Sequence, residues 1–213
     1  MNVGILGSGA VAKTLGDGFL KHGHAVLLGT RDLTKLAEWQ AKHPGAGVGS
    51  FADAAQFGAV IVLAVKGAAA LDVLRLAGSA ALAGKVVMDT TNPIAAEPPE
   101  HGVLRYFTSL DDSLMERLQR AYPDVRFVKA FSSVGNARMV NPQYAAGRPT
   151  MFICGNDAGA KQTVSGVLDQ FGWETLDLGA AEAARAIEPL CILWCIPGFL
   201  RNEWTHAFKV LHA

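Results

Sequence analysis

The chain has 213 residues, and half of them are hydrophobic. This length suits one large domain, or one domain with a small appendage, and supplies enough apolar side chains for a sizeable core. Its 19 Lys and Arg residues balance its 19 Asp and Glu residues. A nucleic acid or an anionic membrane surface would normally be matched by a basic excess or a basic run, so we expect neither as a partner.

The cysteines do not form a recognisable framework. Cys154, Cys191 and Cys195 cannot all pair, and none of them has zinc-like spacing to a histidine, so no metal site is expected. Cys191 and Cys195 lie four residues apart inside an apolar run. Free cysteine often behaves as a small hydrophobic residue, so buried thiols are favoured there over a redox pair.

Apolar runs near the two ends of the chain indicate where in the cell the protein is expected. The first strand begins at Asn2 or Val3, which leaves no room for a signal peptide. The most apolar run, Ala186–Leu200, contains a glutamate and two prolines and is too short to span ~30 Å of hydrocarbon. We therefore expect a cytoplasmic protein without a membrane segment.

Short apolar runs alternate with helical patterns along most of the chain. The runs are rich in β-branched residues and nearly continuous in hydrophobicity, as strands covered on both faces should be. This βαβα rhythm predicts a doubly wound, Rossmann-type parallel sheet with right-handed crossovers. The predicted strands are Val3–Gly7, His24–Gly29, Ala59–Val65, Lys85–Thr91 and Arg126–Ser133, and the predicted helices are Val11–His22, Leu33–Lys42, Ala68–Leu76 and Ser113–Tyr122.

A further unit follows Pro149. Its pattern predicts a strand over Thr150–Gly155, a helix over Ala158–Gly172 and a strand over Trp173–Gly179. Two helical segments, Glu182–Trp194 and Gly198–His212, then close the chain. We expect a nucleotide-binding domain over residues 1–148 and a small C-terminal α/β-helical extension over residues 149–213, either separate from the first sheet or continuous with it.

A glycine-rich turn follows the first strand. Gly7, Gly9 and Ala12 give the pattern G-x-G-x-x-A, between an apolar strand and a helix at the start of a βαβ unit. Gly7 permits the tight turn, Gly9 lets the backbone approach a pyrophosphate, and Ala12 allows close packing of helix and strand. The helix N-terminus favours the phosphate charge. The alternative is a glycine turn with no ligand.

The end of the second strand indicates which nucleotide binds. NAD-binding folds place an acid there to bond the ribose, whereas this chain has Gly29, followed by Thr30 and Arg31. Thr30, Arg31 and Lys35 can converge on a phosphate monoester, which favours NADP(H) over NAD. The alternative is a solvated charge cluster. Asp32 is ambiguous, because it could orient Arg31 or reach a ribose itself.

The ends of the later strands should also face the cofactor, because ligands gather at the carboxyl ends of parallel strands. The predicted strand Ala59–Val65 ends in small residues such as Ala64, which would leave room for the nicotinamide and its ribose. Lys66 could touch phosphate or remain a surface lysine. Asn92 is a better candidate for a ligand contact than Asp89, which lies deeper in its strand. Ala130 could lie against a flat ring.

Ser132, Ser133 and Asn136 follow Ala130. Their side chains could bond a carboxamide or a substrate, although small polar residues are also common turn formers. The six histidines are scattered, and no Ser-His-Asp or Cys-His arrangement is visible, so no catalytic acid or base is assigned. Hydride transfer between two redox rings tolerates that absence, because the cofactors carry the chemistry.

The segments GILGSGAVA, GTRD, DTTNP, VKAF and MFICGNDAGAK occur in this order. With them the chain resembles the coenzyme F420-dependent NADP oxidoreductase family over nearly its full length. The resemblance implies a Rossmann core with a small C-terminal lobe, hydride transfer between NADPH and a deazaflavin, and a homodimer. It places Gly7, Ser8, Gly9, Ala10 and Val11 at the pyrophosphate, Thr30, Arg31 and Lys35 at the 2′-phosphate, and Ala64, Val65 and Ala130 at the nicotinamide.

The chain departs from that family in two places. It reads KAFS where the family often has KAFN, which puts an amide role for Ser132 in doubt, and its C-terminal run is richer in Trp and Cys than expected. The same unit resembles the cytoplasmic domain of membrane ferric reductases, which passes NADPH electrons through a flavin. Imine and β-hydroxyacid reductases share its N-terminal half but need a longer helical second domain.

Three functions therefore stay open. The first is an NADPH-dependent reductase of F420, FMN or FAD. The second is a reductase of a small imine or carbonyl compound, with Tyr144 or His206 as proton donor. The third is a non-catalytic NADP(H)-binding module. The aromatic C-terminal segments would build the acceptor pocket and a homodimer interface, or simply cap the sheet.

Overall fold

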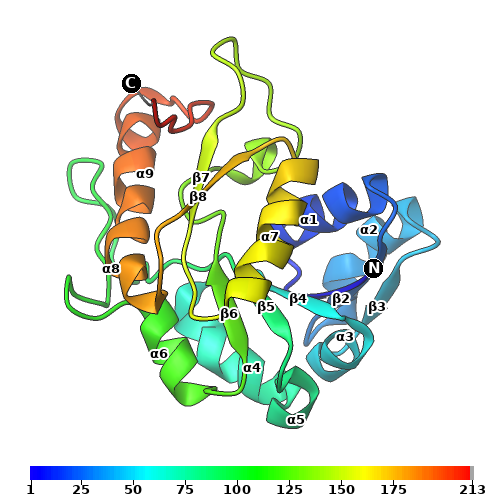
Figure 1. Ribbon diagram of the computed structural model, residues 1–213. Coiled ribbons are helices and arrows are strands. Elements are labelled where there is room, and N and C mark those ends of the chain that lie inside the picture. Colours follow the sequence, from blue (N-terminus) through cyan, green and yellow to red (C-terminus); the bar gives the residue numbers. More distant parts are fainter. Residues whose placement is uncertain (212–213) are drawn as a thin grey trace.

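The structure, a computed structural model, describes residues 1–211. Six parallel strands form one sheet in the order β3-β2-β1-β4-β5-β6 (Figure 1). This order confirms the predicted doubly wound Rossmann-type fold, and it reverses direction between β1 and β4, where such sheets bind ligands. The strands are β1 (Asn2–Leu6), β2 (Ala25–Gly29), β3 (Gly47–Gly49), β4 (Val60–Leu63), β5 (Val86–Asp89) and β6 (Arg126–Lys129).

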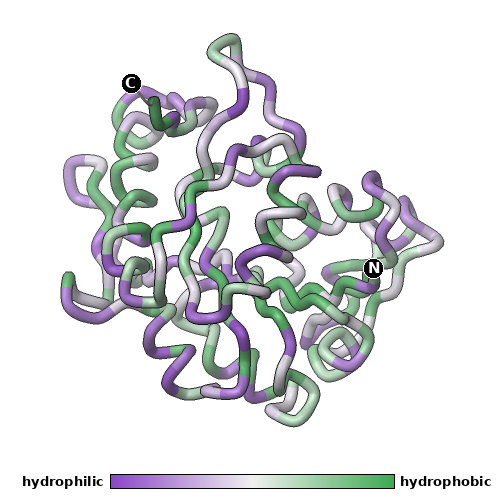
Figure 2. Tube along the Cα trace, in the orientation of Figure 1, coloured by the Kyte–Doolittle hydropathy of each residue, from purple (hydrophilic) through white to green (hydrophobic). Residues whose placement is uncertain are grey.

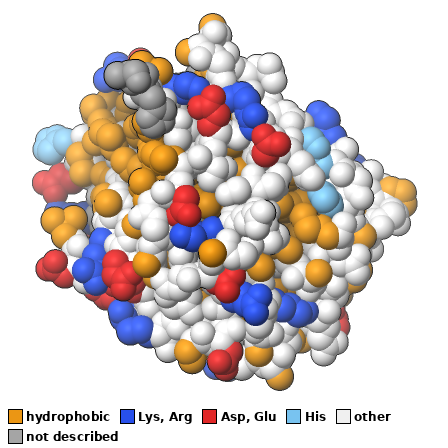
Figure 3. Space-filling model, in the orientation of Figure 1, with side chains coloured by type: hydrophobic (Ala, Val, Ile, Leu, Met, Phe, Trp, Pro, Cys, Tyr) orange, Lys and Arg blue, Asp and Glu red, His pale blue; other side chains and the backbone are white. Residues whose placement is uncertain are grey.

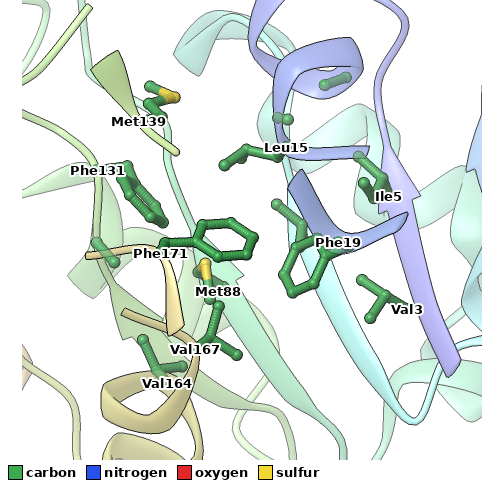
Figure 4. Close-up of a cluster of buried hydrophobic side chains, with 14 of the residues drawn as sticks. Val3, Ile5, Leu15, Phe19, Met88, Phe131, Met139, Val164, Val167 and Phe171 are labelled. Atoms are coloured by element: carbon green, nitrogen blue, oxygen red, sulfur yellow. The ribbon is translucent and has the colours of Figure 1, made fainter. Parts of the chain in front are cut away.

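Helices cover both faces of this sheet, and each face has its own hydrophobic cluster. Side chains of α1, α2 and α7 join one cluster, and side chains of α3 to α6 join the other. Figure 4 shows the first, in which Leu15 and Phe19 of α1 approach Val164, Val167 and Phe171 of the α7 region. The helices are α1 (Ala10–Lys21), α2 (Ala37–Lys42), α3 (Phe51–Phe57), α4 (Ala70–Ala77), α5 (Ser79–Leu82), α6 (Leu114–Ala121) and α7 (Ala158–Gln170).

Strands β7 (Thr150–Ile153) and β8 (Glu174–Asp177) pair in parallel as a second, two-stranded sheet. A single antiparallel bridge, Lys129 to Cys154, joins this sheet to the large one. Helix α7 packs its apolar face on the large sheet, so the C-terminal extension shares the main core. In Figure 2 the hydrophobic residues follow the central strands, while hydrophilic residues mark the outer loops and turns.

The last helical turns are η4 (Ala181–Ala183), α8 (Ala184–Ile187) and α9 (Leu190–Arg201). The predicted helix over Gly198–His212 is wrong. Helix α9 ends at Arg201, because Asn202 takes a left-handed conformation (φ 58°) and the Trp204 ring folds back onto Gly198, where a Cβ would lie 2.3 Å from it. Residues 202–211 then run irregularly along β7, where the Thr150 amide donates to the Phe208 carbonyl (2.9 Å).

Among the described residues, three strands or helices escape the sequence pattern: β3, α3 and the short helix α5. Residues Gly45–Gly49 look like a flexible connection, yet Gly47–Gly49 pair with β2 as an edge strand. Helix α3 follows, and its start is set by a capping box in which the side chains of Ser50 and Asp53 bond each other's backbone amides. A seven-residue helix shows too little periodicity to be recognised, so its capping box is the only local signal.

By length and composition alone, one helical stretch among residues 1–211 could cross a membrane, namely Ala181–Arg201. It comprises η4, α8 and α9 in succession, and a core helix of a soluble protein passes the same test. This stretch contains Glu188, whose carboxylate is 2% exposed and ion-paired with Lys129 inside the protein. The expectation that this stretch does not cross a membrane stays a prediction.

Candidate cofactor-binding site

A cleft of about 580 Å³ opens at the carboxyl ends of β1, β2 and β4, the point where the strand order reverses. Eleven of the thirteen predicted binding residues line it, and Asn92 and Ala130 do not. The cleft is lined by Gly7, Ser8, Gly9, Ala10, Val11, Thr30, Arg31, Asp32, Lys35, Phe51, Ala64, Val65, Lys66, Ala69, Val73 and Thr90.

The glycine loop between β1 and α1 forms the floor of the cleft. Gly7 has a φ of 152°, its amide donates to the Gly29 carbonyl (3.0 Å), and a Cβ on it would lie 2.2 Å from the Ala64 carbonyl oxygen. Gly9 is different, because a Cβ there would meet no protein atom within 4 Å. The loop therefore needs Gly7 in order to fold, whereas the space above Gly9 is left for a ligand.

The start of α1 supplies hydrogen-bond donors to that space. Gly9 is its N-cap and has no side chain to satisfy the first amides, and the first turn contains no acidic residue. The first amides of a helix carry a partial positive charge and bind phosphate readily. An uncapped α1 below an open cradle fits a dinucleotide pyrophosphate, as the glycine pattern predicts.

At the end of β2, Asp32 has a structural role. Its Oδ1 accepts hydrogen bonds from the Thr34 amide (3.1 Å) and the Thr34 hydroxyl (2.6 Å), so Asp32 caps the 3-10 turn η1 (Leu33–Leu36). These bonds from Thr34 hold the pKa of Asp32 below its ordinary value. One oxygen of Asp32 is therefore engaged in its own turn, and Asp32, Arg31 and Lys35 are the charged side chains that line this side of the cleft.

Packing gives Gly29 a second reason to lack a side chain. A Cβ at this position would lie 2.8 Å from the Ser50 carbonyl oxygen and 2.9 Å from the Ala54 Cβ, because α3 packs directly on β2. The ribose-binding acid found in NAD enzymes therefore has no room here. Thr30 is buried beside it, and its hydroxyl lies 3.3 Å from Ser8 Oγ, which links the β2 turn to the glycine loop.

Ala64, Val65, Lys66 and Thr90 line the cleft at the ends of β4 and β5. Ala64 is buried, and Thr90 donates its hydroxyl to the Leu63 carbonyl (2.9 Å), so both present small, fixed surfaces. Lys66 is exposed. A flat ring could lie here without meeting a bulky side chain.

Asn92 and Ala130 occupy other positions. Ala130 is fully buried in the core cluster beneath the sheet ends. The Asn92 amide donates to the Ser132 carbonyl (2.8 Å), which ties the loops after β5 and β6 together. Among residues 1–211, the buried Asn92 Oδ1 and Ser132 Oγ have no hydrogen-bond partner. Their roles toward a cofactor stay predictions, and a carboxamide would suit these two atoms.

Sequence reasoning missed four lining residues, Phe51, Ala69, Val73 and Thr90, and left the role of Asp32 open. Phe51 comes from α3, which itself was not predicted, and Ala69 and Val73 come from the turn and helix after β4. These residues carry no chemical signature. Only the capping box before Phe51 could have indicated that a helix starts at the edge of the cleft.

A buried ionic network lies behind the site. Lys129 Nζ is 2.6 Å from Asp89 Oδ2, 2.9 Å from Glu188 Oε1 and 2.8 Å from the Thr91 carbonyl, and all three charged side chains are at most 2% exposed. Burial alone would lower the pKa of Lys129, but the two carboxylates outweigh burial and raise that pKa. Glu188 also accepts both the Leu114 and Met115 amides at the start of α6 (3.0 Å each).

Candidate proton donors lie away from the cleft. The Tyr144 hydroxyl and His206 Nε2 are buried, and within the described part of the chain they have no hydrogen-bond partner. The His206 ring stacks on Trp194, with centroids 5.1 Å apart. Neither residue lines the cleft. The described residues contain no group of three or more His, Cys, Asp or Glu that could hold a metal ion.

Comparisons with known proteins agree with this geometry. The model of the family described as "NADP oxidoreductase coenzyme F420-dependent" matches residues 2–93. A crystal structure from Arthrobacter sp. FB24, provisionally assigned as an F420-dependent NADP reductase, is 30% identical and has a TM-score of 0.92. The match covers 99% of each chain. An imine reductase from Streptomyces aurantiacus shares only the fold, with 16% identity, a TM-score of 0.71, and coverage of 94% of this chain and 63% of that one.

Among curated proteins, the rat metalloreductase STEAP3 is 31% identical over 204 residues, which cover 93% of this chain and 38% of that protein. Human metalloreductase STEAP2 is 28% identical, with coverage of 89% and 36%. The chain thus spans well under half the length of these relatives. The full-length match to the Arthrobacter protein and the family model over the cofactor cleft lead to one conclusion: the chain belongs to the coenzyme F420-dependent NADP oxidoreductase family and is an NADP-dependent oxidoreductase.

Proposed function

We propose that the protein transfers hydride between NADP(H) and the tricyclic ring of a flavin or a deazaflavin such as F420. The observation that carries this proposal is the make-up of the nicotinamide end of the cleft. Ala64, Val65 and Thr90 line it, and the only titratable side chain near them in the lining is the exposed Lys66. Carbonyl reduction usually needs a positioned acid, whereas hydride exchange between two rings does not.

The chain's own residues would act by binding and orientation. The amides at the start of α1 and the open space above Gly9 would hold the pyrophosphate. Arg31 and Lys35 would hold the 2′-phosphate, since a guanidinium matches phosphate oxygens in a fork and an ammonium adds a point charge. Ala64 and Val65 would leave one face of the nicotinamide open. The bound cofactor supplies the hydride, and rate comes from holding two rings ~3–3.5 Å apart.

The acceptor ring would approach from the C-terminal side. Trp194 of α9 packs on Gly135 in the loop after β6, where a Cβ would lie 2.7 Å from the indole. Ser132 in the same loop is tied to Asn92. The aromatic segment predicted to face the cofactor therefore supports the loops at the carboxyl ends of β5 and β6, and an acceptor bound against them would lie beside the cleft.

Because Ala130 is predicted to lie against the nicotinamide, Ala130→Leu is one way to crowd the ring, but the structure does not suit it. Its side chain is fully buried in the core, so a leucine there would overpack the interior, and lost turnover would report disrupted packing. Val65 is partly exposed and lines the cleft, so Val65→Phe is the better substitution for crowding the open face.

Reduction of a metal ion is the second candidate, because the curated relatives carry the name metalloreductase. In that case a flavin would pass electrons to ferric or cupric ion. Imine or carbonyl reduction is a third candidate, in which Tyr144 or His206 would have to move toward the cleft. A non-catalytic NADP(H)-binding module is the fourth.

The test is NADPH oxidation by the purified protein with separate acceptors: F420, FMN, FAD, ferric citrate with and without FMN, and a cyclic imine. Oxidation with a ring acceptor alone, with a primary isotope effect from NADPH deuterated at nicotinamide C4, supports the proposal. Deuterium bound to flavin nitrogen exchanges with water, so the isotope effect is the readout for flavins. Turnover confined to the imine, or tight NADPH binding with no turnover, would overturn it.

We also propose that the protein forms a homodimer through α9. Leu193 and Leu200 are each 55% exposed and Phe199 is 44% exposed, and hydrophobic side chains gather over this helix in Figure 3. Contiguous exposed apolar surface of this kind marks interaction sites. Light scattering on the wild type should give twice the monomer mass, and Leu193→Asp should give the monomer. A wild-type monomer at high concentration excludes the dimer.

A further inference from the structure

Helix α9 carries a pair of sulfur atoms that the proposed hydride transfer does not use. Cys191 and Cys195 lie one helical turn apart, with their Sγ atoms 4.0 Å from each other. Residues four apart on a helix share a face, so the helix itself holds the two thiols side by side. Cys191 is buried, and Cys195 is partly exposed, so the pair is reached from the surface through Cys195.

The separation of the two sulfurs is wrong for a disulfide. A disulfide needs an S–S distance of about 2.05 Å and close Cβ atoms, and α9 is a continuous helix from Leu190 to Arg201. Closing the gap would require the backbone to unwind. A bridging metal ion needs no such movement: with metal–sulfur distances of about 2.3 Å, the 4.0 Å gap corresponds to an S–metal–S angle of about 120°.

We propose that Cys191 and Cys195 form a binding site for one soft monovalent cation, with Cu(I) as its biological ligand. Thiolates favour soft ions such as Cu(I), zinc and iron–sulfur clusters, and of these Cu(I) alone is satisfied by two or three ligands. Structural zinc needs four, and the described residues contain no group of three or more metal-ligating side chains. Each thiol would lose one proton as its sulfur bonds the metal, and no electron is transferred.

The surroundings of the pair suit this role. The Tyr106 hydroxyl donates to the Glu188 carbonyl (2.8 Å), at the turn that leads into α9, so the phenol ring is held in place there. Ile192 and Ile196 are partly buried next to the cysteines, which makes the site apolar. Neither cysteine lines the nucleotide cleft, so the proposal does not depend on the hydride acceptor.

The third cysteine offers a matched control. Cys154, the residue after β7, is fully buried, with Met115 Sδ 3.5 Å from its Sγ, and burial raises the pKa of its thiol to about 12. It has no second thiol beside it. Cys154→Ser therefore removes one sulfur from the chain while leaving the proposed pair intact.

The test is an anaerobic titration of the pre-reduced full chain with Cu(I), in competition with the chromophoric chelator bathocuproine disulfonate. Wild type and Cys154→Ser should each bind one Cu(I). Cys191→Ser and Cys195→Ser should each weaken binding by about 100-fold or more, since losing a ligand must exceed the 10–100-fold typical of a lost outer-shell partner. X-ray absorption should find sulfur as the dominant ligand.

Circular dichroism on each variant checks that it is folded, and a parallel titration with Zn(II) checks selectivity. Equal Cu(I) affinity in all four proteins would overturn the proposal, and so would loss of binding in Cys154→Ser alone. Zn(II) bound by the wild type more tightly than by Cys191→Ser, with no such difference for Cu(I), would overturn the choice of metal.

Discussion

The nucleotide cleft and the ionic network behind it use polar groups in opposite ways. In the cleft the first amides of α1 have no side-chain cap, and Arg31 and Lys35 face open space. In the network, Lys129, Asp89 and Glu188 are out of contact with water and bond one another. The uncapped donors of α1 thus belong to the binding site, whereas the paired buried charges stabilise the fold. Substitutions should therefore separate affinity from stability.

The largest effect should come from breaking the network. Lys129→Met leaves two buried carboxylates without their cation, which should lower the free energy of unfolding by about 3–5 kcal/mol. Arg75→Met is the matched control, because Arg75 pairs with Asp72 at 3.6 Å while both side chains are at least 70% exposed. Exposed pairs contribute about 0–1 kcal/mol. Urea denaturation at neutral pH measures both, and equal losses would contradict a structural role for the network.

Gly9→Ala should act on binding alone. A Cβ at Gly9 meets no protein atom and its φ of −81° is ordinary for alanine, so the fold should be unaffected. The methyl group would instead occupy the pyrophosphate position and remove amide contacts worth about 3 kcal/mol, or on the order of 100-fold in NADPH affinity. Fluorescence titration measures this. Gly166→Ala, also in open space but on α7, should leave NADPH affinity unchanged.

Arg31→Ala should lose one charge-assisted phosphate contact of roughly 1.5–3 kcal/mol, hence about tenfold or more in NADPH affinity. Affinity for NADH, which lacks the 2′-phosphate, should hardly change. Calorimetric titration of both nucleotides into the variant tests this prediction. Equal losses for the two nucleotides would mean that Arg31 contacts a part of the cofactor that both share.

The smallest effect concerns Glu116 of α6, a buried carboxylate that pairs with the partly exposed Arg185. Hydrogen bonds from Arg185, then from Ser113, lower the pKa of Glu116 to about 2. Because the folded pKa lies below the unfolded value of about 4.3, this stabilisation is complete above that pH and is lost as the pH falls toward 2. Arg185 is 39% exposed, so we expect only about 1 kcal/mol at neutral pH.

Glu116→Gln should therefore lower stability at pH 7 and show a weaker dependence on pH between 5 and 3 than the wild type. Denaturation midpoints across that range test the sign. If the two proteins lose stability in parallel as the pH falls, the ion pair with Arg185 does not contribute.

Most of the cleft was predictable because its signals are local. Gly7 and Gly9 stand in a fixed motif, and Thr30, Arg31 and Lys35 follow the second strand at a fixed distance. The prediction of the cleft was less complete for residues that reach it only through the packing of helices on the sheet. Phe51 and Val73 reach the cleft from helices whose positions depend on sheet packing, and Ala130 turned inward because the strand before it alternates its side chains between two buried faces.

The sequence by itself determined the parallel sheet, the nucleotide loop and the preference for NADP(H), since each follows from hydrophobic periodicity or from residues within about 30 positions of one another. Only the tertiary structure decided that the tail after Arg201 folds back along β7 and that Glu188 reaches Lys129 and the start of α6. These contacts depend on burial, because a charge or a helix end meets its partner only when distant segments of the chain pack together.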